Sequence, residues 1–291
     1  MADHLESRDS YSPLEIARRV EQYGITKGKM EFGKLALLAT LAGAFIAIGS
    51  IFYITVTADS KMSYGATMLI GGLCFNLGLL LCVIAGAELF TGNCLLSIAW
   101  AQKKITIGQL LRNLALVWVF NLVGSLIMVA LLYYAQVWAG GGNQVGARAL
   151  YVGASKVALT PGVIFLRGLL ANLMVCLACW MSYSGRTTMD KFMGMLLPIT
   201  AFVAGGYEHS IANQFFIPFA MMLKGNAAVV ALSGVAAEKL RYLTPGYLVQ
   251  NLIFSTLGNV VGGAILVGLV YWAIYLGSDS GTKSPKSRAA A

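Results

Sequence analysis

Six long apolar runs restrict this chain to one class of fold. They cover approximately residues 35–58, 66–102, 108–136, 162–184, 190–222 and 248–276. A straight helix needs about 20 apolar residues to cross a bilayer. Only 11% of the residues are charged, whereas a soluble domain carries roughly 25%. We therefore predict an all-α membrane protein with six transmembrane helices in a domain of residues 35–276, preceded by a segment of residues 1–34 and followed by a disordered tail of residues 277–291.

The second and fifth runs are too long for one simple span, and both contain polar residues. The fifth includes Gly205 to Asn213, a stretch with a carboxylate, an imidazole, a hydroxyl and an amide. At membrane depth the chain can leave the helical conformation only where protein groups or a water-lined cavity form hydrogen bonds with the freed backbone N–H and C=O groups. We predict broken helices here, residues 66–90 then 94–102 and residues 190–207 then 211–222. An ionisable side chain at this depth marks a functional-site hypothesis.

The two halves of the chain resemble each other. Residues 121–133 match residues 259–271 at seven of thirteen positions, and residues 86–93 match 206–213 at Gly, Glu and Asn. The halves therefore align as three spans and three spans. An odd number of spans per copy turns one copy upside down in the membrane, so the sequence predicts a 3+3 inverted repeat. Inverted repeats with broken helices place a transport site near the membrane midplane.

The basic residues lie mainly at the ends of the apolar runs. With both termini on the cytoplasmic side, 14 Lys and Arg residues fall inside and 7 outside, as the positive-inside rule requires. Membrane orientation therefore explains the net charge of +9 better than nucleic-acid binding does, and no nucleic-acid partner is expected. The polar, charged start through Lys34 does not fit a cleavable signal peptide.

The N-terminal segment contains a helix-start pattern. Ser12, Pro13 and Glu15 form a capping box with proline at the first helical position. We predict an amphipathic helix that ends near Tyr23, before Gly24. It is expected to rest on the membrane or on a neighbouring subunit, and a solvated helix is the alternative.

The two breaks are expected to bring Thr91 and His209 together at the membrane centre, with free backbone N–H groups that favour an anion. His209 is the side chain best able to carry a proton. Glu88 and Glu208 are interpreted as structural, accepting hydrogen bonds from freed backbone N–H groups, and Asn93 and Asn213 occupy repeat-related half-helix starts.

Other candidates have two readings each. Lys156 either snorkels to the interface or attracts anions at an outer vestibule. Asn172 either lines the path or bonds helices together. Five apolar residues are interpreted as packing or as a pore constriction: Phe75, Leu79, Phe90, Val175 and Phe202. The glycines Gly71, Gly72, Gly124, Gly258, Gly262, Gly263 and Gly268 allow close helix packing.

No enzyme chemistry is expected. Ser210 beside His209 could suggest a hydrolase, but adjacent residues rarely face each other and no Gly-x-Ser-x-Gly elbow is present. The five cysteines lie in apolar segments without metal-site spacing, so we expect neither a metal nor another cofactor. The paired Asn-Pro-Ala motif of a water or glycerol pore is missing.

The sequence resembles the formate/nitrite transporter family, and most closely its formate channel branch. The resemblance rests on Phe75 to Leu79, Glu88 to Thr91, Lys156, Ala171 to Leu177, Trp180 to Arg186, and Glu208 to Asn213 followed by Ile217-Pro218.

That resemblance implies an aquaporin-like protomer with its own pore, in a homopentamer of the bacterial inner membrane. It implies that Thr91 faces His209, and that Lys156 and Asn172 occupy outer anion-attracting positions. It also implies an outer constriction from Phe75, Phe90 and Val175, and an inner one from Leu79 and Phe202. The expected function is pH-dependent permeation of formate and similar small monovalent anions. The alternatives are a nitrite, hydrosulfide or lactate channel, or an aquaporin-like neutral-solute pore.

Overall fold

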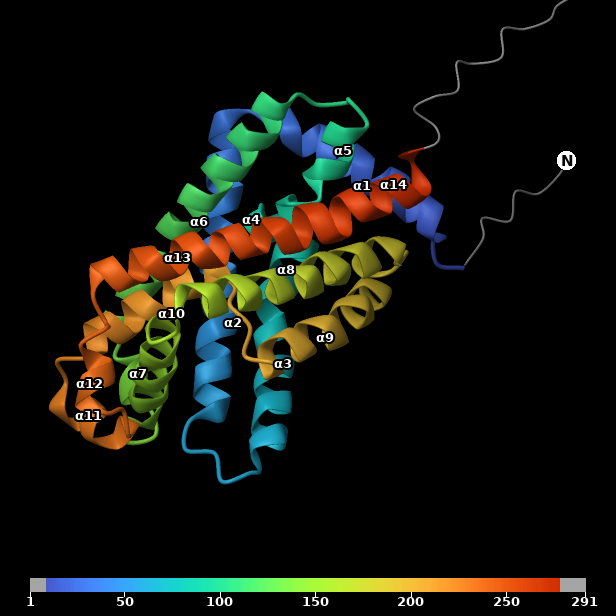
Figure 1. Cartoon of the computed structure of the whole chain (residues 1–291). Coiled ribbons are helices and arrows are strands. Elements are labelled where there is room, and N and C mark those ends of the chain that lie inside the picture. The colour runs from blue at the N-terminus through green and yellow to red at the C-terminus, as the bar shows by residue number, and fades with distance from the viewer. Residues whose placement is uncertain (1–8, 278–291) are drawn as a thin grey trace, which may run out of the picture.

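The computed structural model describes residues 9–277, and these residues form helices and connecting loops without strands. The predicted tail therefore lies outside the described residues apart from Gly277. The helices are α1 (Pro13–Gly28), α2 (Phe32–Thr57), α3 (Tyr64–Leu80), α4 (Phe90–Asn93), α5 (Leu96–Ala101), α6 (Ile107–Tyr134), α7 (Gln144–Val157), α8 (Pro161–Ser184), α9 (Thr188–Ala204), α10 (Ser210–Leu223), α11 (Ala227–Ser233), α12 (Ala237–Leu240), α13 (Pro245–Val260) and α14 (Val270–Tyr275) (Figure 1).

Five helices of the described region are long and apolar enough to cross a membrane. They are α2, α6, α8, α3 with a π-helical turn to Gly86, and a continuous Pro245–Tyr275 helix that joins α13 to α14 through a π-helical segment. The predicted fifth span is divided between α9, of 17 residues, and α10, of 14 residues. The six predicted apolar runs thus correspond to six helical regions, and the second and the fifth are interrupted.

Both predicted breaks are present, and a glycine initiates each. Gly86 has φ of +84° and Gly206 has φ of +65°, a left-handed conformation that is costly for a residue with a Cβ. In each break the chain then runs through Glu88 or Glu208 before the next helix begins at Phe90 or Ser210. The second half-helix after the first break begins four residues earlier than predicted, because the side chain of Asn121 binds the Phe90 N–H.

Repeat-related glycines set the closest helix contacts. A Cβ on Gly124 of α6 would overlap the Thr40 carbonyl oxygen of α2, and a Cβ on Gly262, in the π-helical segment that continues α13, would overlap the Leu169 carbonyl oxygen of α8. In lipid, such close backbone approach replaces the hydrophobic effect as the source of helix association. The α2–α6 and α8–α13 crossings are therefore the same packing unit in the two repeats.

The N-terminal helix differs from the prediction in length and in location. The Ser12–Glu15 capping box is present, but α1 continues through Gly24 to Gly28. Gly24 does not end the helix because it packs against α5, where a Cβ would come 2.8 Å from the Cβ of Ala99. The helix therefore lies on its own protomer, with its buried face against α5 and α8.

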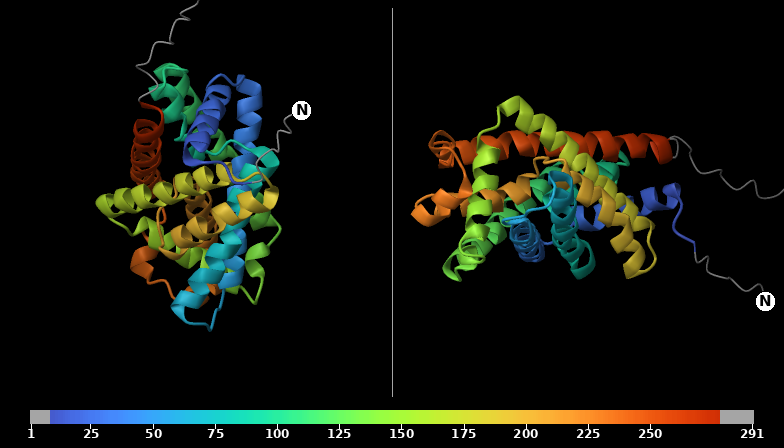
Figure 2. Two further views of the ribbon diagram at one scale, coloured as in Figure 1. Left: turned by 90° about the vertical axis from the view of Figure 1, so that its right-hand side faces the viewer. Right: turned by 90° about the horizontal axis from the view of Figure 1, so that it is seen from below.

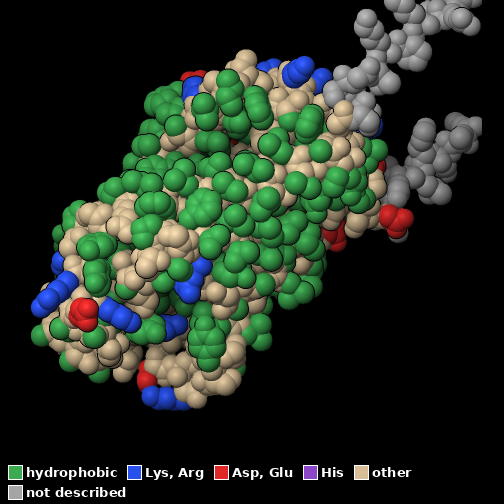
Figure 3. Space-filling view, viewed as in Figure 1, with side chains coloured by type: hydrophobic (Ala, Val, Ile, Leu, Met, Phe, Trp, Pro, Cys, Tyr) green, Lys and Arg blue, Asp and Glu red, His purple; other side chains and the backbone are tan. Residues whose placement is uncertain are grey.

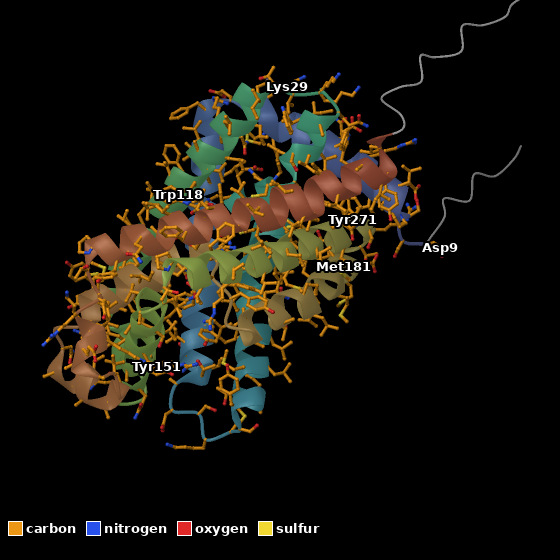
Figure 4. All side chains as sticks on the ribbon, viewed as in Figure 1. Asp9, Lys29, Trp118, Tyr151, Met181 and Tyr271 are labelled. Carbon is orange, nitrogen blue, oxygen red and sulfur yellow. The ribbon has the colours of Figure 1, made fainter. Side chains whose placement is uncertain are left out.

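Helix α7 lies between the third and fourth apolar runs, where the sequence analysis predicted no helix. It is amphipathic, like α1, and it precedes α8 as α1 precedes α2. Lys29, just after α1, and Tyr151 of α7 lie at opposite ends of the molecule (Figure 4). The repeat therefore includes an amphipathic helix in each half, on opposite sides.

The surface agrees with a membrane-spanning protein. Apolar side chains form a broad central band on the face of Figure 3, and most of the Lys, Arg, Asp and Glu side chains lie toward its two ends. The two further views show the α2–α3 hairpin, α8 and α9, and the long α13–α14 helix running past one another (Figure 2).

Candidate functional site

Two cavities lie at opposite ends of α3. The first, of about 480 Å³, extends from the start of α3 to Phe75 and is also lined by α7; we call it the α7-side cavity. The second, of about 320 Å³, extends from Leu79 past the end of α3 and along the first break to Asn93, and is also lined by α1; we call it the α1-side cavity. A solute that crossed the protomer would pass from one cavity to the other through the layer between Phe75 and Leu79.

Thr91 and His209 meet in that layer, as predicted. Thr91 Oγ1 lies 2.9 Å from His209 Nε2, and both side chains are almost fully buried. His209 also lines the α7-side cavity. Each residue comes from a different repeat and from a repeat-related break, so the pair lies where the two halves meet.

A backbone hydrogen bond fixes the tautomer of His209. The Ala212 N–H donates to His209 Nδ1 at 3.0 Å, so this side chain caps the N-terminus of α10. A neutral imidazole that accepts at Nδ1 carries its proton on Nε2. The Nε2–H group therefore donates to Thr91 Oγ1, and the Thr91 hydroxyl proton is left to donate to something else.

Glu88 and Glu208 anchor two equivalent polar clusters. Glu208 pairs with Lys156 at 2.9 Å and accepts from the side chains of Asn213 at 2.7 Å and Asn251 at 3.2 Å. In the other repeat, Glu88 pairs with Lys27 at 3.0 Å and accepts from Asn93 at 2.8 Å, while Asn113 receives a second bond from Asn93 at 2.9 Å. The expectation that freed backbone N–H groups bind these carboxylates was wrong, because side chains fill that role.

Two asparagines satisfy the freed backbone instead. The Asn121 Oδ1 atom accepts from the Phe90 N–H at 3.0 Å, and the Asn259 Oδ1 atom accepts from the Ser210 N–H at 2.9 Å. Their amide groups donate to the carbonyl oxygens of Glu88 and Glu208, at 2.9 and 3.0 Å. The first N–H of each second half-helix is therefore occupied, which corrects the expectation that both are free for an anion.

Lys27 is a component that the sequence reasoning missed. It lies in the last turn of α1, as Lys156 lies in the last turn of α7. Both also place their backbone carbonyl against a repeat-related asparagine, Asn113 or Asn251. Alignment of the two amphipathic helices would have revealed this equivalence, but the Gly-rich stretch before α7 concealed the second helix.

The apolar candidates lie where a constriction is possible, with one change of grouping. Phe75 and Phe202 touch edge to face, with ring centroids 5.6 Å apart, and both line the α7-side cavity. Phe202 also lies 5.6 Å from the His209 ring. The expected grouping of Phe202 with Leu79 was therefore wrong, since Leu79 lines the α1-side cavity. Phe90 and Val175 are buried and line neither cavity.

Asn172 and Lys156 have structural partners. The Asn172 amide donates to the Asn259 carbonyl oxygen at 2.7 Å, and Asn172 lines neither cavity. This geometry matches the helix-bonding interpretation. Lys156 lines the α7-side cavity but is paired with Glu208.

Ser210 and His209 do not form a nucleophile–base pair. Both ring nitrogens of His209 are engaged, by Ala212 and Thr91, and Ser210 Oγ is buried without a hydrogen-bond partner in the described region.

Comparison with known proteins identifies the family. The model of the formate/nitrite transporter family matches residues 14–273. The chain belongs to the formate/nitrite transporter family. Among members of this family, the formate channel FocA of Escherichia coli K12 is 44% identical over 272 residues, covering 92% of this chain and 95% of FocA. A probable formate transporter of Methanothermobacter thermautotrophicus is 37% identical, covering 91% of this chain and 97% of that protein.

Solved structures of formate/nitrite transporters share the fold. A pentameric formate channel with formate bound superimposes with a TM-score of 0.77 at 41% identity, over 84% of this chain and 98% of that chain. An ion channel of the family superimposes with a TM-score of 0.74 at 27% identity, over 89% of this chain and 98% of that one. The predicted fold class and the resemblance noted from the sequence are both confirmed.

Proposed function

We propose that this protein is a channel for formate and similar small monovalent anions, assembled as a homopentamer with one pore per protomer in the bacterial inner membrane. The names of the relatives and of the solved pentamer support formate and five-fold assembly. The observation that carries the proposal is the buried Thr91–His209 contact between two cavities, each lined by basic residues.

In this proposal the α7-side cavity opens outside the cell and the α1-side cavity opens to the cytoplasm. The distribution of Lys and Arg supports this orientation. An entering anion reaches the Phe75–Phe202 contact, which must separate to let it pass. It then meets Thr91 and His209, and leaves past Leu79.

Thr91 supplies the hydrogen bond at the narrowest point. Apolar walls such as Phe90 and Val175 strip water from a carboxylate, and an unpaired charge is costly to desolvate. The Thr91 hydroxyl accepts from His209 Nε2–H and can donate its own proton to the anion. His209 therefore orients and polarises this donor.

Formate crosses the apolar layer most readily as the neutral acid, and water in the cavities supplies the proton. His209 is poorly arranged as that source. Loss of its Nε2 proton would leave an imidazole without any proton, and protonation of Nδ1 first would break the bond to the Ala212 N–H. Flux should rise as the pH falls, because the neutral fraction of the acid rises.

The test is His209→Asn in protein reconstituted in liposomes. Asn is a strong N-cap residue, so it can keep the bond to the Ala212 N–H, but it is too short to reach Thr91. The variant removes the bond that orients the Thr91 hydroxyl. A hydrogen bond between neutral groups contributes about 0.5–1.5 kcal/mol, so formate uptake should fall by roughly two- to tenfold. Native mass should still correspond to five 31.0 kDa chains. Unchanged uptake with an unchanged pH response would remove His209 from the mechanism.

Substrate preference needs a selectivity series on the purified protein. Formate, nitrite, lactate and chloride are compared at two pH values, with glycerol swelling as the neutral-solute control. Faster nitrite or lactate flux would keep the pore and change its substrate. Rapid glycerol swelling would favour the neutral-solute alternative.

A further inference from the structure

The α7-side cavity contains two positive charges that no carboxylate balances. Its charged lining residues are Arg148, Lys156, Arg167 and Glu208. Lys156 and Glu208 are paired at 2.9 Å and cancel each other. Within residues 9–277, neither arginine forms an ion pair. The net positive charge of this cavity therefore comes from Arg148 and Arg167, and not from Lys156.

Arg148 is held rigidly by neutral groups. Its Nε donates to Thr57 Oγ1 at 3.1 Å, and one Nη2 proton goes to the Tyr53 hydroxyl at 3.0 Å. Both acceptors come from α2, whereas Arg148 belongs to α7. Hydroxyl oxygens fix the direction of the guanidinium without cancelling its charge.

The remaining donors of Arg148 suit a small carboxylate. A guanidinium has five N–H groups in a planar fork that matches two carboxylate oxygens. The contacts to Thr57 and Tyr53 occupy two of the five. The ring of Tyr151, whose centroid is 5.5 Å from the guanidinium carbon, covers one side of the group. The half-buried arginine therefore presents the rest of its fork without having to be ordered by the ligand.

Arg167 is less well arranged. Its side chain is exposed, and its only hydrogen bond within the described chain is to the Gly206 carbonyl oxygen at 3.5 Å. It contributes charge to the cavity but not a fixed geometry.

We propose that Arg148 is the capture residue of the α7-side cavity, which binds a small monovalent carboxylate before it reaches the Phe75–Phe202 contact. This inference rests on the proposed function, because the same anion is the permeating species. Lys156 positions the break through Glu208 and is not the principal anion attractor.

The test compares Arg148→Gln, Arg148→Lys and Arg241→Gln in the full-length protein. Arg241 is the matched control, because it is an exposed arginine after α12 that does not line the cavity. Radiolabelled formate uptake is measured against formate concentration in right-side-out and inside-out membrane vesicles. The half-saturating concentration and the maximal rate are determined for each variant.

Arg148→Gln should raise the half-saturating concentration about tenfold for entry from the α7 side, at the low end of the effect of charged clefts on association. It should leave entry from the α1 side and the maximal rate within about twofold of the unmodified protein. Arg148→Lys should recover part of the loss, because it keeps the charge without the fork, and Arg241→Gln should match the unmodified protein.

Three results would overturn the inference. The first is an unchanged half-saturating concentration in both vesicle types, which would leave the formate channel itself intact. The second is an equal loss of maximal rate in both directions, which would indicate that Arg148 only supports α2 and α7. The third is absence of formate uptake by the unmodified protein, which would also refute the proposed function.

Discussion

Removal of the Lys156 charge should destabilise the protein more than removal of any exposed lysine charge. The Lys156 side chain is 14% exposed and that of Glu208 is 2% exposed. Removing one partner of a buried pair costs about 3–5 kcal/mol, because the other charge stays buried without compensation. Asn213 and Asn251 still donate to Glu208, so Lys156→Met should lie near the lower limit, about 3 kcal/mol.

This loss of unfolding free energy can be measured as a fall in the melting temperature, Tm. One kcal/mol corresponds to about 2–4 °C in a domain of this general size, so Lys156→Met should lower the Tm by about 6–12 °C. Tryptophan fluorescence in detergent would follow the unfolding. The double variant Lys156→Met with Glu208→Gln should recover most of the loss, because neither partner is then charged.

Two variants provide the comparison. Lys61 pairs with Asp59 at 2.6 Å, but their side chains are 84% and 50% exposed, and such pairs contribute about 0–1 kcal/mol. Lys61→Met should therefore have little effect. Lys27, 20% exposed against 7% for Glu88, should fall between the two. If Lys156→Met were no worse than Lys61→Met, or if the double variant were worse than the single one, the account of the polar clusters would be wrong.

Three further outcomes are expected. Gly206→Ala should lower stability by about 1–2 kcal/mol, because φ of +65° disfavours a Cβ, whereas Gly225→Ala, with open space around it, should be close to neutral in the same melting assay. Asn259→Ala should cost about 3 kcal/mol or more, since it leaves the Ser210 N–H and the Glu208 carbonyl oxygen unpaired and removes the bond to the Gly168 carbonyl oxygen; an unchanged Tm would count against this explanation. Phe202→Ala should raise lactate flux relative to formate flux, because the ring closes the α7-side cavity against Phe75; an unchanged ratio in the liposome assay would show that this contact does not select by size.

The features that could be predicted from the sequence are those that depend on short stretches of the chain or on the similarity of its two halves. The lengths of the apolar runs predicted the membrane spans. The polar run Glu208-His209-Ser210 predicted the break in the fifth span, and the match of residues 121–133 with 259–271 predicted the inverted repeat. Thr91 and His209 could be paired because equivalent breaks in inverted copies must meet. These inferences need only periodicity, length and internal symmetry.

The features that sequence missed depend on contacts between distant residues. Asn121 and Asn259 fall inside apolar helices, and their partners lie 31 and 49 residues away. Gly24 looked like a helix stop, yet it is a contact point for α5. The carboxylates of Glu88 and Glu208 were assigned to backbone groups because their lysine partners lie on helices whose placement no local pattern reveals.

Each polar cluster is complete within its own half of the chain. Lys27, Glu88 and Asn113 all precede α7, and Lys156, Glu208 and Asn251 all follow the start of α7. A single copy, with its amphipathic helix included, therefore satisfies its own buried charges. The contact of Thr91 with His209 and that of Phe75 with Phe202 each need both copies, so this centre could form only after duplication.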